Sequence, residues 1–146
     1  MEYLAGISLA LAVSLFATFA GFDRDRALYP MMTVVIASYY DLFAVMDGSA
    51  HALGLETIAL SAFVLVSVIG FRTNLWLVVG ALAGHGLFDL IHPVLITNAG
   101  VPAWWPMFCL TYDVVAAAYL AWLLSHSALA AEAGSVIRRQ AVGEKS

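Results

Sequence analysis

The sequence predicts an all-α fold, a polytopic bundle of membrane-spanning helices with five as the expected number. Of the 146 residues, 63% are hydrophobic and only 11% are charged. Soluble domains average about 45–50% apolar and about 25% charged residues. The apolar residues also form long uncharged runs, each close to the roughly 20 residues that a helix needs to cross a bilayer. We therefore expect the lipid bilayer to be the solvent around this chain.

Five such runs are separated by short polar stretches. The first run ends at the charged stretch 23–26, and the second opens at Pro30, which the first turn of a helix tolerates. We expect one bundle domain, residues 1–126, followed by a cytoplasmic tail, residues 127–146, whose first part forms a short interfacial helix. The predicted spans are residues 4–22, 29–46, 52–71, 75–96 and 105–124.

The basic residues predict how the bundle is oriented. With five spans, Arg24 and Arg26 fall in the first loop, Arg72 falls in the third, and Arg138, Arg139 and Lys145 fall in the tail. These segments all lie on one side of the membrane. Because positively charged loops stay in the cytoplasm, we expect an outside N-terminus and a cytoplasmic C-terminus. A four-span or six-span chain would place the basic residues on both sides. The expected location is the bacterial inner or cell membrane.

Several functional classes are excluded by what the sequence lacks. It has no P-loop, no glycine-rich dinucleotide fingerprint, no CxxC and no HExxH motif. No large basic face is available for nucleic acid. Cys109 is the single cysteine, so an internal disulfide is excluded. The first apolar run is expected to be retained, because no basic residue precedes it as in a secretory signal.

Six ionisable residues fall inside the predicted spans. Each such group costs about 2.5–3.5 kcal/mol on insertion scales, so they are expected to face the bundle interior, a wet cavity or one another. Asp89 and Asp113 come out at nearly one depth, roughly 10 Å and 12 Å below the outer helix ends. The predicted pocket opens toward the outside. The six residues are Asp41, Glu56, His85, Asp89, His92 and Asp113.

The fourth span carries the most specific pattern. His85, Asp89 and His92 have the spacing i, i+4, i+7, which places them on one helix face. Imidazole and carboxylate groups together bind divalent metals such as zinc, so these three are candidate metal ligands. Asp113 or Asp41 is the candidate third ligand or orienting group. A metal-free proton or substrate site and a purely structural polar core are the alternatives.

The polar residues of the predicted pocket fall into two groups. His85, Asp89 and Asp113 are the candidate catalytic residues, and Asp41, Glu56 and Tyr112 are expected to line the same pocket. Small residues flank the carboxylates, as expected where membrane helices approach closely. Gly80 and Gly84 predict a further close-packing step on the fourth span.

Four further segments of the chain are distinctive: Phe22-Asp23-Arg24-Asp25-Arg26, Ala37-Ser38-Tyr39-Tyr40, His85-Gly86-Leu87-Phe88-Asp89 and Val101-Pro102-Ala103-Trp104-Trp105-Pro106. They resemble a small bacterial family of multi-pass membrane proteins of unknown function. The likeness covers most of the chain and implies no activity. The arrangement is also loosely similar to membrane-embedded metal hydrolases that hold zinc with histidines and an aspartate, although their full signature is not reproduced here.

Two functional hypotheses from different classes follow. One is a metal-dependent hydrolase or isomerase acting on a lipid or small apolar substrate. The other is a proton- or cation-coupled small transporter or channel component, which at this size is expected to be a homo-oligomer. A structural membrane subunit is the third and simplest interpretation. Bound metal in the purified protein favours the first hypothesis, and gradient-dependent flux in liposomes favours the second.

Overall fold

The computed structural model is helical throughout the part of the chain it describes, namely residues 1–24 and 26–143, with side chains up to residue 127. Five α-helices and one 3-10 turn make up this part, and it contains no strand. The predicted all-α class is therefore confirmed, and the first four predicted spans match their helices to within a few residues, whereas the fifth helix continues well beyond residue 124. The elements are α1 (Glu2–Ala20), η1 (Phe22–Arg24), α2 (Leu28–Asp47), α3 (Ala50–Arg72), α4 (Trp76–Leu95) and α5 (Trp105–Gly143).

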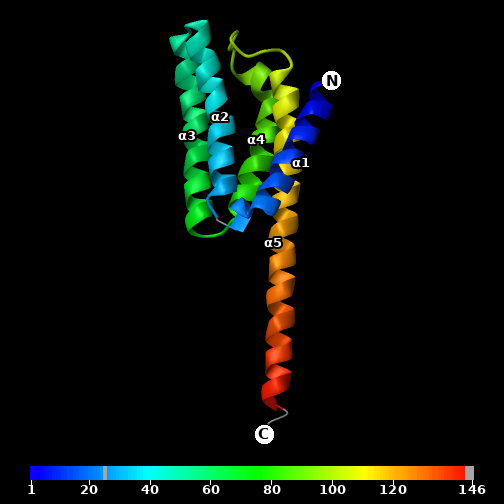
Figure 1. Cartoon of the computed structure of the whole chain (residues 1–146). Coiled ribbons are helices and arrows are strands. Elements are labelled where there is room, and N and C mark those ends of the chain that lie inside the picture. Colours follow the sequence, from blue (N-terminus) through cyan, green and yellow to red (C-terminus); the bar gives the residue numbers. More distant parts are fainter. Residues whose placement is uncertain (25, 144–146) are drawn as a thin grey trace.

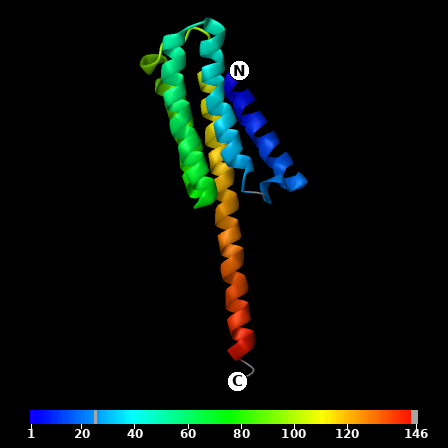
Figure 2. The same cartoon turned by 90° about the vertical axis from the view of Figure 1, so that its left-hand side faces the viewer.

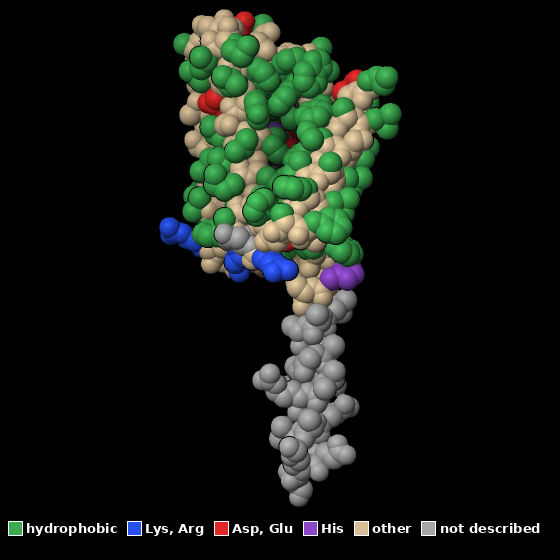
Figure 3. Space-filling view, in the orientation of Figure 1, with side chains coloured by type: hydrophobic (Ala, Val, Ile, Leu, Met, Phe, Trp, Pro, Cys, Tyr) green, Lys and Arg blue, Asp and Glu red, His purple; other side chains and the backbone are tan. Residues whose placement is uncertain are grey.

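All five helices are long and apolar enough to cross a membrane, and Trp105–Ser127 is the candidate span of α5. Between 17% and 39% of each span is buried inside the bundle. The outward surface is correspondingly apolar, with side chains such as Phe19 and Val94 each 88% exposed. Soluble proteins rarely leave apolar patches of this extent open to water. Five helices of spanning length and a largely apolar exterior, visible in Figure 3, are the features of a multi-pass membrane protein.

The helices pack in two groups. The α2–α3 hairpin stands on one side, and α1, α5 and α4 stand on the other, with α5 between α1 and α4 (Figures 1 and 2). The N-terminus and the α4–α5 connection lie at the same end of the bundle, here called the loop end. The other end holds the α1–α2 and α3–α4 connections and is here called the arginine end. Alternate helices run in opposite directions.

The described basic side chains gather at the arginine end, as Figure 3 shows. They are Arg24, Arg26 and Arg72. The Arg26 guanidinium donates to the carbonyl oxygen of Thr73 at 3.4 Å and so ties the α1–α2 connection to the α3–α4 turn. Trp76 also begins its helix at this end, whereas Trp105 begins α5 at the loop end. The two tryptophans thus lie where the aromatic belts of a membrane protein are found.

Helix α5 continues well past the bundle at the arginine end (Figure 1). Its backbone is helical from Trp105 to Gly143. The predicted tail, residues 127–146, therefore begins inside this helix. The expected interfacial segment and the basic residues of the tail have side chains that lie outside the described residues.

Local chemistry explains the turn between α2 and α3 at the loop end. Gly48 ends α2 with φ of 73°, a left-handed conformation that glycine adopts without a steric penalty. Ser49 then caps α3, because its hydroxyl oxygen accepts from the amide of Ala52 at 3.2 Å. A tight turn of this kind holds α2 and α3 antiparallel along their whole length.

Close approach of α4 to α5 depends on Gly86. A Cβ atom at this position would lie 3.3 Å from the carbonyl oxygen of Leu110 and 3.4 Å from the Cβ of Asp113. The predicted packing step at Gly80 and Gly84 is wrong, because both residues are exposed and face open space. The buried stripe of α4 runs through Leu82, Gly86 and their neighbours, on a different side of the helix.

Candidate functional site

One face of α4 presents three ionisable side chains to the bundle interior. His85, Asp89 and His92 are each between 0% and 2% exposed. Their spacing of four and then three residues keeps them on the buried stripe of the helix. Three such groups would be costly in hydrocarbon unless each had a polar partner. The neighbouring helices α2, α3 and α5 supply those partners.

Asp113 of α5 and Asp89 of α4 meet at the ring of His85. The Nδ1 atom of His85 lies 2.7 Å from Oδ2 of Asp113 and 3.5 Å from Oδ2 of Asp89. One ligand atom from each of the three residues falls within 4.8 Å of the other two, and all three side chains are buried. We call these residues the His–Asp–Asp cluster. Its ligand atoms are close enough together to bind one metal ion.

The cluster has spare acceptor capacity. Oδ1 of Asp113 and Oδ2 of Asp89 have no hydrogen-bond partner among the described residues. Buried carboxylate oxygens are normally hydrogen-bonded, and those that are not call for an explanation such as an ion. With both carboxylates ionised, a protonated His85 leaves a net charge of −1 and a neutral His85 leaves −2. A divalent cation beside a neutral His85 brings the net charge to zero.

Tyr40 of α2 orients Asp89 from the opposite side. Its hydroxyl group donates to Oδ1 of Asp89 at 2.6 Å, and its side chain is 1% exposed. The bond fixes the second carboxylate oxygen, Oδ2, on the side of His85. The sequence leaves open whether Tyr40 supplies its hydroxyl group to the pocket or only packs in the core, because nothing in the periodicity of α2 shows which group that hydroxyl meets.

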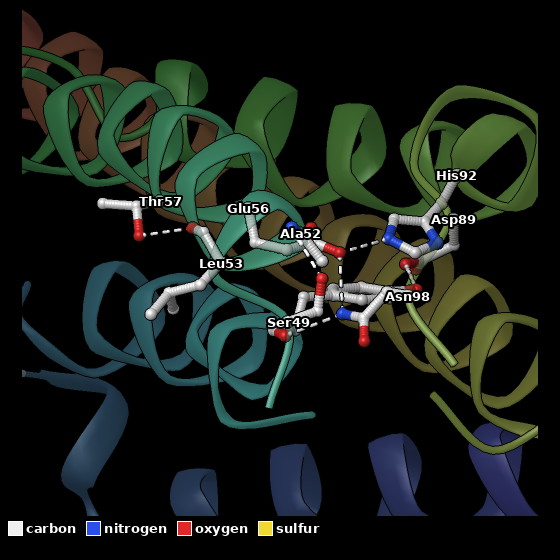
Figure 4. Close-up of polar contacts among 9 residues, drawn as sticks. Ser49, Ala52, Leu53, Glu56, Thr57, Asp89, His92 and Asn98 are labelled. Carbon is white, nitrogen blue, oxygen red and sulfur yellow. Dashed lines mark hydrogen bonds and ion pairs between the residues drawn. The ribbon is translucent and has the colours of Figure 1, made fainter. Parts of the chain in front are cut away.

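A second group of polar side chains lies closer to the loop end. Oε1 of Glu56, on α3, lies 2.7 Å from Nε2 of His92 and accepts from Nδ2 of Asn98 at 2.9 Å. Figure 4 shows dashed contacts from this carboxylate to both partners. We call these three residues the Glu56 cluster. All are at least nine-tenths buried, and neither Oε2 of Glu56 nor Oδ1 of Asn98 has a hydrogen-bond partner in the described chain.

Tyr40 connects the two clusters. Its carbonyl oxygen accepts from Nδ2 of Asn98 at 3.1 Å, and its ring centroid lies 4.1 Å from that of His92. Since its hydroxyl group binds Asp89, this one residue contacts members of both clusters. A continuous set of polar contacts therefore runs from Asn98 to Asp113.

A cavity of about 400 Å³ lies at the loop end, beside the Glu56 cluster. We call it the vestibule. The end of α4, the α4–α5 connection and Pro106 line it, and His92 and Asn98 are among its lining residues. Gly100 lets the connection pack closely, because a Cβ atom there would collide with the carbonyl group of Phe43. The connection thus folds over the ends of α2 and α4.

A second cavity, of about 500 Å³, is an apolar groove between α1, α2 and α5. Figure 3 shows the bundle face hollowed between α1 and α2. Leu9, Met32 and Ile36 are among its lining residues, together with Cys109 and Tyr112 of α5. Cys109 lies one helical turn from Asp113, so the floor of this groove is close in sequence and space to the His–Asp–Asp cluster.

The structure does not bring every candidate residue together. Asp41 lies half-buried between α2 and α3, where Oδ1 accepts from the Thr57 hydroxyl at 2.6 Å and Oδ2 has no partner among the described residues. Tyr112 packs in the apolar core with Leu82 and borders the groove. Glu56 and His92 form their own cluster. The His–Asp–Asp cluster itself is closed, with residues at most 1% exposed, and the vestibule at the loop end is a cavity that borders His92 and Asn98.

Asn98 is the site residue that the sequence did not single out. It follows α4 in an irregular connection and is 8% exposed, with its amide folded back onto Glu56. A polar residue in a loop that contains glycine and proline is ordinarily predicted to be exposed to solvent. The only available signal is its position beside the end of a helix that carries buried histidines.

Comparison with known proteins adds no assignment. No family model, curated protein or solved structure matches the chain.

Proposed function

We propose that the protein is a metal-dependent hydrolase or isomerase of the cell membrane, acting on a lipid or small apolar substrate. The observation that carries this proposal is the His–Asp–Asp cluster, in which His85, Asp89 and Asp113 bring three buried ligand atoms within 4.8 Å of one another. His92, which the sequence grouped with these ligands, binds Glu56 instead. Asp113 takes its place as the third ligand.

The spacing within the cluster suits a small divalent ion. A tetrahedral zinc site with ligands at about 2.0–2.2 Å holds neighbouring ligand atoms roughly 3.3–3.6 Å apart. The separation from Nδ1 of His85 to Oδ2 of Asp89, 3.5 Å, lies in this range, and the separation to Oδ2 of Asp113, 2.7 Å, is shorter. One nitrogen and two carboxylate oxygens suit zinc, manganese or ferrous iron better than they suit a soft ion.

Each residue then has a distinct task. His85, Asp89 and Asp113 would hold the ion, and Tyr40 would keep Asp89 in its ligating orientation through the 2.6 Å hydrogen bond. A bound divalent ion would lower the pKa of water or polarise a carbonyl group. Asp113 keeps one carboxylate oxygen, Oδ1, that can take a proton from the reacting molecule.

The substrate class follows from the apolar groove. Its lining is dominated by aliphatic and aromatic side chains, and its volume of about 500 Å³ suits part of an acyl chain or a small apolar molecule. Such a molecule reaches the groove from the bilayer without crossing water. Cys109 and Tyr112 border the groove within one helical turn of Asp113, which places the reacting end near the cluster.

The alternative is a proton- or cation-coupled transporter, and the continuous polar contacts from Asn98 to Asp113 favour it. Coupled transport requires that the ions also leave on the other side. Toward the arginine end the described core holds no buried carboxylate or histidine, and its buried polar groups are the hydroxyls of Ser14, Tyr29, Thr33 and Ser67 among apolar residues such as Leu82 and Leu120. The contacts among carboxylates and histidines reach the middle of the bundle and go no further, which favours the enzyme.

Orientation is part of the same proposal. We place the loop end outside and the arginine end in the cytoplasm of a bacterial cell, because the described arginines gather at one end. The vestibule then opens toward the outside.

Metal content tests the proposal. Purified wild-type protein should carry about one equivalent of divalent metal, and His85→Ala, Asp89→Asn and Asp113→Asn should each carry far less. Asp41→Asn is the matched control, since it makes the same change at a carboxylate that lies outside the cluster. Equal metal content in all five proteins, or none in the wild type after exposure to Zn²⁺, Mn²⁺ and Fe²⁺, contradicts the proposal.

A further inference from the structure

We propose that the vestibule and the Glu56 cluster form a cation-loading site, through which a divalent cation from the loop end reaches the His–Asp–Asp cluster past Tyr40. This inference rests on the proposed metal site and adds to it a second, transient binding site with its own residues. The site is distinct from the cluster, because Glu56 and Asn98 contribute no atom to the His–Asp–Asp group.

The need for such a route comes from burial. His85, Asp89 and Asp113 are between 0% and 1% exposed, so an ion cannot reach them from bulk water without passing other side chains. A hydrated divalent ion does not travel through the apolar groove, since it would have to leave its water in hydrocarbon. The vestibule is the cavity whose lining includes members of the polar network, His92 and Asn98.

The Glu56 cluster presents acceptors that nothing in the described chain satisfies. Nδ2 of Asn98 donates to two acceptors, Oε1 of Glu56 and the carbonyl oxygen of Tyr40, and this fixes which end of the amide is the oxygen. Oδ1 of Asn98 and Oε2 of Glu56 remain without partners, although both side chains are at least nine-tenths buried. Two buried acceptor oxygens, one of them on a carboxylate, suit a cation or its hydration water.

The path onward is short and continuous. His92 and Asp89 lie three residues apart on α4, and His85 lies four further, so each step is about one helical turn of roughly 5 Å. The Tyr40 ring lies 4.1 Å from the His92 ring and its hydroxyl group reaches Asp89. A cation that leaves the Glu56 cluster therefore meets Tyr40 and then the unpartnered oxygen of Asp89.

Loading kinetics test this inference separately from metal binding. Metal-free protein in detergent is mixed with Zn²⁺ held by a chromophoric chelator, and the transfer of zinc is followed by stopped-flow absorbance. Glu56→Gln should slow the transfer by about tenfold or more, because the negative charge that attracts the ion is lost, while the final zinc content stays at the wild-type level. Asp41→Asn should load at the wild-type rate.

A second variant avoids the polar network altogether. Ala103 is an exposed residue of the vestibule lining, so Ala103→Phe narrows the cavity without changing a buried contact. It should also slow loading and leave the final zinc content unchanged. Wild-type rates in both variants overturn the loading site but leave the metal site intact. A wild-type protein that takes up none of Zn²⁺, Mn²⁺ and Fe²⁺ overturns both proposals.

Discussion

The Tyr40 hydroxyl group on α2 donates a 2.6 Å hydrogen bond to Oδ1 of Asp89 on α4, and both side chains are at most 1% exposed. Tyr40→Phe should destabilise the protein by about 1–3 kcal/mol, because it leaves a buried carboxylate oxygen without a donor. Thermal unfolding in detergent measures this effect. The adjacent Tyr39 is 38% exposed, so Tyr39→Phe is the matched control and should change the free energy of unfolding by less than about 0.5 kcal/mol. Equal effects of the two substitutions would show that the Tyr40 hydrogen bond contributes nothing to the free energy of unfolding.

Glu56 and His92 should behave as a coupled pair. Each single replacement by leucine leaves the other group buried without its partner, at a cost of about 3–5 kcal/mol. The double replacement Glu56→Leu/His92→Leu should cost less than the sum of the two by at least about 1 kcal/mol. Unfolding free energies of the four proteins measure the coupling.

The control cycle combines Glu56→Leu with His51→Leu, an exposed position on the same helix. That cycle should be additive within about 0.5 kcal/mol, since the two side chains share no partner. Additivity in both cycles would mean that the 2.7 Å contact between Glu56 and His92 has no energetic consequence.

Replacing a glycine by alanine should lower the stability of the protein at Gly6 on α1 and raise it at Gly54 on α3. A Cβ atom at Gly6 would collide with the Phe108 carbonyl oxygen and the Thr111 hydroxyl group, so Gly6→Ala should separate α1 from α5 and cost about 1–3 kcal/mol. Nothing lies within 4 Å of a Cβ atom built at Gly54. Gly54→Ala should therefore stabilise α3 by about 0.5–1 kcal/mol, because alanine loses less backbone entropy in a helix. Thermal shifts of the same sign would contradict the tight α1–α5 contact.

The helices could be predicted from the sequence because hydrophobic length alone decides them. The third span, for example, was expected at residues 52–71 and is found at Ala50–Arg72. The common face of His85, Asp89 and His92 was likewise predictable, since it follows from helical spacing within one segment. What periodicity cannot give is the partner of each group. Asp41 and Asp113 both lie in stripes of small residues, and only the packing of α5 on Gly86 brings Asp113, rather than Asp41, to His85.

The contacts of Asn98 could not be predicted from the sequence either. Its role depends on how the α4–α5 connection folds back over α2, where the lack of a side chain at Gly100 permits the close contact with Phe43. Loop conformations of this kind have no periodic signature. The glycine and proline residues around Asn98 predict a turn but not its direction.

Membrane orientation can be tested with reporter fusions. A reporter inserted after Ser49 or after Gly100 should read as outside, and one after Thr73 should read as cytoplasmic, because the described arginines lie at the end that contains Thr73. Fusions at Ser49 and Gly100 serve as internal controls for each other, since both belong to the loop end. A cytoplasmic reading at either position would contradict the proposed orientation or the number of five spans.

Stability with and without metal separates a binding site from a polar core that only holds the helices together. In metal-free protein, Asp113→Asn keeps an oxygen that accepts from His85 and removes one of two neighbouring buried negative charges, so stability should be unchanged or higher. Added Zn²⁺ should stabilise the wild type by about 2.7 kcal/mol at one hundred times its dissociation constant. Asp113→Asn should show little of that gain, while Asp41→Asn should show all of it. A purely structural cluster gives the opposite pattern: Asp113→Asn is destabilising in the metal-free protein, and zinc shifts none of the three unfolding temperatures.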